Sequence, residues 1–313
     1  MLIKINRDIP LIGCIAFGII DRGTNLLQVR ATSVCNINCP FCSVDGGSQS
    51  KTHENFYEVD CDYLVEEIAK VVEFKGDNIE INIDSVGEPF CYPELEKLTK
   101  NIRKIKGVNK ISIQTNGTLY KDVDVDIINL SLHSMDSTLA KELSGSPCFN
   151  LELLKTNAQK WKDKGIQIRL CPVWVPKIND EELPKIIQYA KENNFELGIQ
   201  KYEVYKHSRK IKKVKALNWW KFYKQLELWE KEFDIKLRIK AKDLDIQRVQ
   251  RLPEMFKKGE KILVELVCQG WNKGQMIGIA KDRCISINDC DKEIGDLIKV
   301  KILESSNNIY LAE

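Results

Sequence analysis

The stretch SVCNINCPFCSVDGG, residues 33–47, places Cys35, Cys39 and Cys42 within eight residues, and no other part of the chain groups thiols so densely. A disulfide framework is disfavoured because three is an odd number. Three thiolates from one loop suit a 4Fe–4S cluster whose fourth iron has no protein ligand and stays free to bind another molecule. The stretch therefore predicts a metal site with one open coordination position.

Zinc is the alternative metal for this stretch. A structural zinc site takes four ligands, commonly as two closely spaced pairs. Cys61 or His53 would have to supply the fourth ligand, and Cys61 has no partner at short spacing. Eight further cysteines are scattered along the chain, and each is expected to be a small buried apolar side chain.

The composition is that of a globular protein without a membrane span. The 313 residues are 43% hydrophobic and 30% charged, which suits one large core and a small second domain. The longest apolar run, residues 10–20, has eleven residues and is too short to cross a bilayer. No small-residue cleavage site follows it, so we expect a cytoplasmic protein.

Strand-like and helix-like segments alternate between residues 25 and 205, which predicts a parallel α/β sheet with right-handed crossovers, a barrel or part of one. The polar and reactive residues follow the expected strands one by one: Cys35, 87–89, 115–117, 131–134 and 169–172. Because the carboxyl ends of parallel strands meet at one edge, we expect these residues to share a site.

The pattern changes after residue 205. Residues 206–215, KHSRKIKKVK, hold six Lys and Arg and no acid, and residues 201–260 carry a net charge of +9. Such a run is either a solvated face or a phosphate-binding surface. Helices are expected over residues 217–233 and 244–256. From residue 259, four to five short strands with glycine-containing turns predict a small OB-like barrel.

The cysteine stretch and its surroundings resemble the radical S-adenosylmethionine (radical SAM) superfamily. The CxxxCxxC motif with an aromatic residue, Phe41, before its last cysteine follows the first strand, as in that family. Residues 86–89, VGEP, resemble its Gly-Gly-Glu-Pro motif with the first glycine replaced, and TNG at 115–117 resembles the end of its third strand. The resemblance extends over residues 26–205 and implies a partial (β/α)6 TIM-like barrel.

The resemblance also implies which residues bind the cofactors. Cys35, Cys39 and Cys42 would hold a 4Fe–4S cluster. S-adenosylmethionine (SAM) would be contacted by Phe41, Gly87, Glu88, Pro89, Asn116, Ser131, Arg169 and Ile199. In the family pattern Ser131 reaches the ribose, Arg169 the carboxylate and Ile199 the adenine. No catalytic side chain is expected beyond the cluster, because the cofactors carry the chemistry.

The implied activity is reductive cleavage of SAM to methionine and a 5′-deoxyadenosyl radical, which takes a hydrogen atom from a substrate. A low-potential electron donor such as ferredoxin or flavodoxin would supply the electron. Methylthio transfer is disfavoured, because only Cys14 precedes Cys35 where that subgroup has three further cysteines. Cys268, Cys284 and Cys290 could hold a second cluster, although their spacing matches no established pattern.

The last 55 residues resemble a TRAM-like domain, which accompanies several tRNA-modifying enzymes. The expected organisation is an N-terminal extension (1–24), a radical SAM core (25–205), a basic helical segment (206–258) and a TRAM-like β-barrel (259–313). The leading interpretation is an enzyme that modifies RNA, above all tRNA. Because the barrel holds seven Lys and Arg against nine Asp and Glu, the basic segment would supply the phosphate contacts.

Two other functions are weighed against RNA modification. The enzyme could act on a small molecule or a protein side chain, with the barrel used to dock a partner. A non-enzymatic RNA-binding protein that retains a structural cluster is disfavoured by the intact three-cysteine motif and Glu88. Four tryptophans, Trp219, Trp220, Trp229 and Trp271, could stack on bases, but helical spacing favours core positions for the first three.

Overall fold

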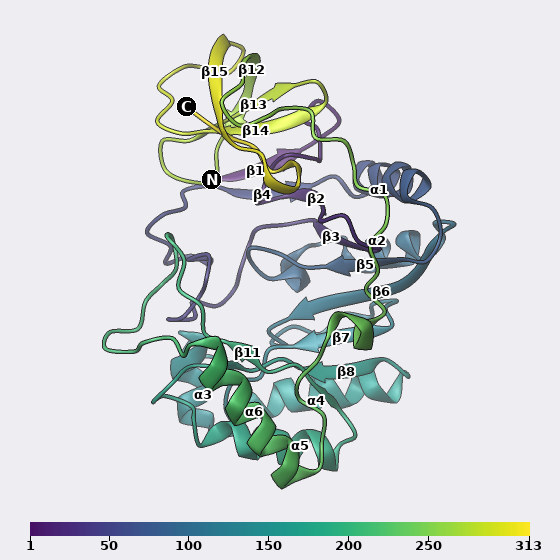
Figure 1. Ribbon diagram of the computed structural model, residues 1–313, viewed down its shortest axis with the longest axis vertical. Coiled ribbons are helices and arrows are strands. Elements are labelled where there is room, and N and C mark those ends of the chain that lie inside the picture. Colours follow the sequence, from purple (N-terminus) through teal and green to yellow (C-terminus); the bar gives the residue numbers. More distant parts are fainter.

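The computed structural model describes all residues from 1 to 313, and its main element is a seven-stranded sheet with the order β10-β8-β7-β6-β5-β3-β2 (Figure 1). The strands are β2 (Gly18–Asp21), β3 (Leu26–Arg30), β5 (Ile79–Ile83), β6 (Val108–Thr115), β7 (Ile127–Leu130), β8 (Gln167–Leu170) and β10 (Glu196–Leu197). Six of them run parallel, and β2 pairs antiparallel with β3 at one edge. This confirms the predicted partial (β/α)6 barrel.

Helices connect the parallel strands and cover one side of the sheet (Figure 1). They are α1 (Cys61–Lys75), α2 (Leu95–Ile102), α3 (Ser137–Ser144), α4 (Leu151–Asp163) and α5 (Glu182–Glu192). Three of them begin at a capping side chain that accepts a backbone N–H of the first turn, namely Asp60, Asp136 and Asn150. These caps fix the residues at which the three helices begin.

The two faces of the sheet differ in polarity because side chains alternate along each strand. In β5, Ile79, Ile81 and Ile83 are fully buried in the main core. The residues between them, Glu80 and Asn82, turn the other way, and both accept a hydrogen bond from the Ser112 hydroxyl on β6. The concave face of the half-barrel is therefore polar, and the convex face packs against the helices.

Two short parallel pairs complete this part of the chain. Strand β1 (Leu2–Ile5) pairs with β4 (Phe56–Val59), and β9 (Val173–Trp174) pairs with β11 (Gln200–Lys201). The β1–β4 pair brings the start of the chain beside the segment that follows the cysteine loop.

The last strands close into a barrel with the order β12-β13-β14-β16-β15, which confirms the predicted C-terminal barrel. Its strands are β12 (Lys261–Gln269), β13 (Met276–Ala280), β14 (Arg283–Ile287), β15 (Leu297–Glu304) and β16 (Leu311–Ala312), with a 3-10 turn η3 (Ser306–Asn308). The barrel has its own apolar core, which includes Leu266, Ile285, Ile302 and Tyr310.

The segment between sheet and barrel differs from expectation. Helix α6 (Trp219–Phe233) forms as predicted. The prediction of a helix over residues 244–256 is wrong, because a 3-10 turn η2 (Ala241–Leu244) is followed there by extended chain. Here tertiary hydrogen bonds replace helical ones. Backbone groups of Val249 and Leu252 donate to Gly23 and Asp21, and the fully buried Lys75 ammonium donates to the Gln250 carbonyl. These bonds hold the segment against the β2–β3 edge.

Membrane insertion through a helix finds no support in this fold. None of the helices combines the length and the apolar character that a bilayer span requires.

Candidate active site

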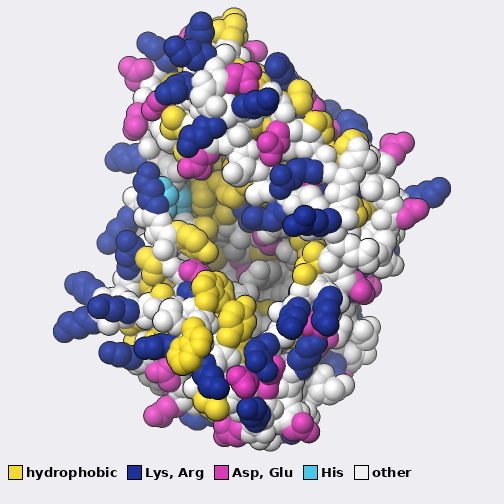
Figure 2. Space-filling view, viewed as in Figure 1, with side chains coloured by type: hydrophobic (Ala, Val, Ile, Leu, Met, Phe, Trp, Pro, Cys, Tyr) yellow, Lys and Arg dark blue, Asp and Glu magenta, His cyan; other side chains and the backbone are white.

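A cavity of about 430 Å³ lies at the carboxyl ends of the parallel strands. Most of the residues expected to form the site line it: Cys35, Cys39, Phe41, Cys42, Gly87, Glu88, Pro89, Asn116 and Ser131. This one cavity is therefore lined by residues from the ends of β3, β5, β6 and β7, as the parallel topology predicts. The molecular surface is hollowed in the middle of this face, and Lys and Arg side chains stand around the hollow (Figure 2).

The three cysteines lie on one loop between β3 and β4 and are partly exposed to the cavity. Burial raises the pKa of the Cys35 thiol to about 12 and also raises that of Cys39. These thiols therefore keep their protons at neutral pH and would release them on binding a metal. The positive charge of the metal favours this release. No three His, Cys, Asp or Glu side chains converge as they would on a single ion. A cubane instead takes one thiolate at each of several corners, so separated thiols at one cavity fit it.

Neighbouring backbone shapes this loop. Asn38 N–H donates to the carbonyl of Ser144 at the end of α3 (2.9 Å). Gly145 follows in a left-handed conformation (φ 59°), and a Cβ there would lie 2.0 Å from the Asn38 oxygen. Gly46 lies close to the Val86 carbonyl, which would be 2.7 Å from an added Cβ. Only glycine lets the loop lie between α3 and the turn after β5.

Glu88 joins two of the strand-end turns. It is 2% exposed, and its carboxylate accepts hydrogen bonds from the Thr115 hydroxyl (2.7 Å), Asn116 N–H (2.7 Å) and Phe90 N–H (2.9 Å). Burial raises the pKa of Glu88 to about 7, although the two N–H donors and the hydroxyl oppose the shift. Pro89 begins the 3-10 turn η1 (Pro89–Cys91), and of this turn Pro89 lines the cavity, as Glu88 does.

Asn116 extends this network to the cysteine loop. Its side-chain amide donates to the Asn36 side chain (2.8 Å), and its oxygen accepts from the N–H and the hydroxyl of Thr118. Gly87, in the turn after β5, lies against the loop after β3. A Cβ added at Gly87 would lie 2.3 Å from the Val34 carbonyl. The loop after β3, the turn after β5 and the turn after β6 therefore form one hydrogen-bonded unit.

His133 is a cavity residue outside the family pattern. Its Nδ1 accepts the Val173 N–H (3.1 Å), which fixes the proton of the neutral ring on Nε2. The ring meets Phe41 edge to face, with 4.9 Å between centroids. Burial lowers the pKa of His133 to about 4. At neutral pH the site thus holds an uncharged hydrogen-bond donor.

The pKa of His133 predicts a pH effect on folding. The unfolded imidazole binds a proton below pH 6.5, whereas the folded one stays neutral down to about pH 4, so acid favours unfolding. Between pH 7 and pH 4.5 the cluster-free wild type should lose about 2 to 3 kcal/mol more stability than His133→Gln. Urea unfolding at both pH values measures this. Equal losses in both chains would contradict it, and His207→Gln, which removes an exposed imidazole, should behave as the wild type.

Two of the expected SAM contacts do not line the cavity. The Arg169 guanidinium lies further along the concave face, where it pairs with Glu196 (2.7 Å) and donates to Asn129 (3.2 Å). Ile199 is 8% exposed and belongs to the main apolar core. The roles of both residues toward SAM stay predictions.

Several neighbours of the site were missed by sequence reasoning. Arg209 and Asp45 form an ion pair that ties the basic segment to the cysteine loop (2.6 Å). His53 stacks on Trp271 of the barrel at 3.6 Å between ring centroids. The composition of the basic run predicts only a solvated or phosphate-binding surface, because no local pattern marks residues that meet from such distant positions.

Comparison with known proteins identifies the family. Residues 29–190 match the family model described as the radical SAM superfamily. The chain belongs to the radical SAM superfamily. It is 40% identical to Uncharacterized protein MJ0103 of Methanocaldococcus jannaschii, with 99% of this chain and 80% of that protein aligned. It is 25% identical to the probable GTP 3′,8-cyclase of Sulfurisphaera tokodaii, over 87% of this chain and 85% of that one.

Solved structures share the fold of this radical SAM protein. Streptococcus suis SuiB bound to S-adenosylmethionine superposes with a TM-score of 0.52 at 18% identity, over 66% of this chain and 47% of that one. TYW1 with a lysine-pyruvate adduct bound gives 0.51 at 18% identity, over 72% and 80%. Members of the superfamily are enzymes that use SAM and an iron–sulfur cluster, so this chain is a radical SAM enzyme.

Proposed function

We propose that this radical SAM enzyme binds a 4Fe–4S cluster through Cys35, Cys39 and Cys42, cleaves SAM reductively, and modifies RNA, above all tRNA. The observation that carries the cofactor part is the single cavity lined by the three cysteines and by the glycine–glutamate–proline turn. When bound, the cluster supplies the electron that cleaves SAM to methionine and a 5′-deoxyadenosyl radical. A low-potential donor such as ferredoxin or flavodoxin reduces it.

The protein residues bind and orient SAM in this proposal. Backbone and side-chain groups of Gly87, Glu88, Pro89 and Asn116 surround its methionine part, and Ser131 reaches its ribose. The proposed SAM contacts also include Phe41, Arg169 and Ile199. To reach the SAM carboxylate, Arg169 must leave its ion pair with Glu196. The cavity would hold the target C–H of the substrate near the cleaved bond.

Exposed aromatic side chains beside the cavity support an RNA substrate. Trp219 and Trp220 at the start of α6 are 55% and 71% exposed, so the core positions that helical spacing favours for them are wrong, and Tyr223 is 45% exposed. Lys201, which lines the cavity, places its ammonium 4.8 Å from the Trp219 ring centre. Exposed aromatic rings beside the cavity suit the stacking of unpaired bases.

Positive charge adjoins these rings. In residues 206–215 every lysine is exposed, and this segment connects β11 to α6. Such charge draws in phosphates and makes binding depend on salt. The proposed organisation is the one expected from the sequence, with the TRAM-like barrel of residues 259–313 as a docking module. Eleven free cysteines suit a reducing compartment, so we place the enzyme in the cytoplasm.

One observation favours a second candidate function, a radical SAM enzyme acting on a small molecule. The similarity to the probable GTP 3′,8-cyclase of S. tokodaii extends over most of both chains. A nucleotide would meet the same polar concave face as an RNA nucleotide, and the barrel would then dock a protein partner.

Mass spectrometry of tRNA nucleosides, from cells with and without the gene, tests the RNA substrate. We expect one modified nucleoside to disappear in the deletion strain. An unchanged nucleoside profile, together with release of 5′-deoxyadenosine on addition of GTP to the reconstituted enzyme, would favour the small-molecule function instead.

Removing the two exposed indoles should weaken RNA binding. In the double variant Trp219→Ala/Trp220→Ala the dissociation constant for tRNA should rise roughly tenfold or more, because each lost stacking contact contributes about 1–3 kcal/mol. Filter binding over a series of salt concentrations measures both affinity and salt slope. Phe74→Ala, at an exposed position at the end of α1, is the matched control and should bind as the wild type. Equal affinity of the double variant and the control would contradict the proposed surface.

A further inference from the structure

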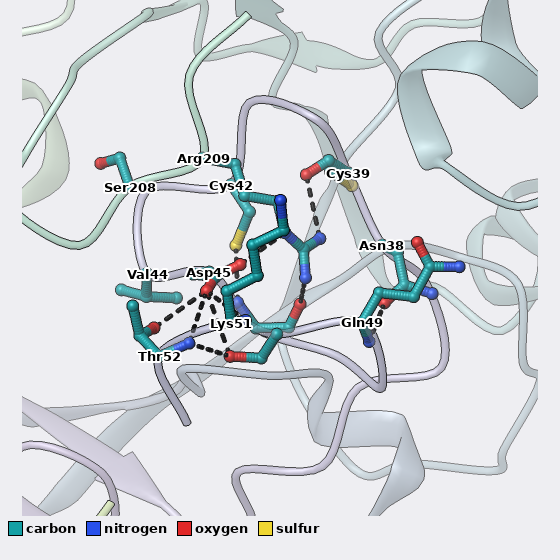
Figure 3. Close-up of polar contacts among 12 residues, drawn as sticks. Asn38, Cys39, Cys42, Val44, Asp45, Gln49, Lys51, Thr52, Ser208 and Arg209 are labelled. Atoms are coloured by element: carbon teal, nitrogen blue, oxygen red, sulfur yellow. Dashed lines mark hydrogen bonds and ion pairs between the residues drawn. The ribbon is translucent and has the colours of Figure 1, made fainter. Parts of the chain in front are cut away.

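Arg209 crosses from the basic segment to the cysteine loop (Figure 3). Its guanidinium donates to the Asp45 carboxylate (2.6 Å), to the Cys39 carbonyl (3.2 Å) and to the Gly46 carbonyl (2.6 Å). Its own backbone N–H donates to the Cys42 carbonyl (2.9 Å). One residue thus holds three carbonyl groups of the loop, two of which belong to the cysteines themselves.

Asp45 fixes the other side of the same loop. One carboxylate oxygen faces Arg209, and the second accepts hydrogen bonds from Lys51 N–H (2.8 Å), Thr52 N–H (3.1 Å), the Thr52 hydroxyl (2.9 Å) and the Ser50 hydroxyl (3.2 Å). The Asp45 side chain is 6% exposed and that of Arg209 16% exposed. Burial opposes ionisation of this carboxyl, but these donors lower its pKa overall. The pair is therefore a charged link that water barely reaches.

A second contact reinforces the crossing. The Ser208 hydroxyl donates to the Ser43 carbonyl (2.9 Å), so two consecutive residues of the basic segment bind the loop. The lysines on either side of them, Lys206 and Lys210, are exposed and make no such contact. Arg209 is thus set apart from the rest of the run by its partners.

We propose that Arg209 is a positioning residue for the iron–sulfur cluster: together with Asp45 it holds the Cys39–Gly46 loop in the shape that presents its thiols to the cavity, and it places a positive charge beside the cluster. The inference rests on the proposed binding of the cluster by Cys35, Cys39 and Cys42, and it does not depend on the substrate.

Two physical effects follow from this placement. The planar guanidinium donates to several acceptors at once, which a lysine ammonium at the end of a flexible chain does not reproduce. The charge also stabilises the reduced cluster, which is the more negative state, more than the oxidised one, so it raises the reduction potential. A purely structural role gives no reason for the potential to follow the charge at position 209, which Arg209→Lys keeps and Arg209→Gln removes.

The test compares Arg209→Gln and Arg209→Lys with the wild type after anaerobic reconstitution with iron and sulfide. Two quantities are measured without substrate: the rate at which a chelator removes iron, and the midpoint potential from a redox titration followed by electron paramagnetic resonance. Arg209→Gln should lose iron roughly tenfold faster, as expected when charge-assisted hydrogen bonds to the loop are lost, and its potential should become more negative. Arg209→Lys should keep the potential near that of the wild type but lose iron faster.

Arg7→Gln is the matched control, because it removes a bidentate arginine–carboxylate pair, with Glu66, at an exposed position. It should match the wild type in both measurements. Wild-type iron loss and potential in Arg209→Gln would overturn the proposal. If that variant does not fold, Asp45→Asn, which keeps the side-chain shape, must show faster iron loss for the proposal to stand. If the cysteine variants hold iron as well, the cluster assignment itself fails, which is a separate result.

Discussion

Cys35→Ala, Cys39→Ala and Cys42→Ala should each leave a folded chain that holds no intact cluster and releases no 5′-deoxyadenosine. The three side chains are only partly buried, so truncation removes little packing. Loss of one thiolate, in contrast, removes one of only three protein ligands proposed for the cluster. Iron and sulfide analysis, visible absorbance and product analysis after reduction with dithionite measure the effect.

Cys91→Ala is the control for these variants. Cys91 lies near enough to Cys35 for its charge to influence the pKa of that thiol, yet it does not line the cavity. This variant should keep wild-type iron and sulfide. Full iron and sulfide content in any of the three variants would exclude that cysteine as a ligand, and loss of iron in Cys91→Ala would mean that the ligand set is wrong.

Gly87→Ala should destabilise the cluster-free chain and abolish SAM binding. The added methyl group would lie 2.3 Å from the Val34 carbonyl oxygen and 2.4 Å from that of Ser33, both of which are backbone atoms that cannot rotate away. Overpacking of this kind costs about 3 kcal/mol or more. It also separates the Glu88 N–H from the Val34 carbonyl, a hydrogen bond of 2.7 Å. Urea unfolding and anaerobic equilibrium dialysis with SAM measure the two effects.

Gly198→Ala provides the comparison. It follows β10 at the same edge of the sheet, but an added Cβ would be 3.4 Å from its nearest neighbours, which is ordinary contact. Its stability should stay within about 1 kcal/mol of the wild type. If Gly87→Ala were as stable as Gly198→Ala and bound SAM, the close approach of the two turns would have no importance for the site.

The sequence alone predicts the sheet and the barrel because their patterns are local. Period-two alternation in residues 78–85 and helical spacing in residues 62–74 follow from which face of each element is buried. The prediction of a helix over residues 244–256 is wrong because the hydrogen bonds of this segment are not local. Its backbone donors and acceptors are satisfied by β2, by the β2–β3 turn and by Lys75, and such distant partners leave no local signal.

In the candidate site, too, the residues that follow strand ends are predictable from the sequence, and the residues that meet through packing of distant elements are not. Cys35, Glu88 and Asn116 follow strand ends, and parallel strands must bring their carboxyl ends together, so their meeting at one cavity is predictable. Arg209 lies 164 residues from Asp45 along the chain, and Trp271, in the connection between β12 and β13 of the barrel, packs in the main apolar core. Their contacts with the cysteine loop depend on how separate elements pack, which composition and spacing do not encode.

The contacts between the barrel and the cysteine loop also order events during synthesis. Trp271 stacks on His53, Lys273 N–H donates to the Thr52 carbonyl, and Asn55 donates to the Gly270 carbonyl. The loop leaves the ribosome early, but its last neighbours leave it more than 200 residues later. The nascent chain therefore lacks these contacts until residue 273 has emerged, and we expect the end of the loop at residues 52–55 to be held in place only after that point.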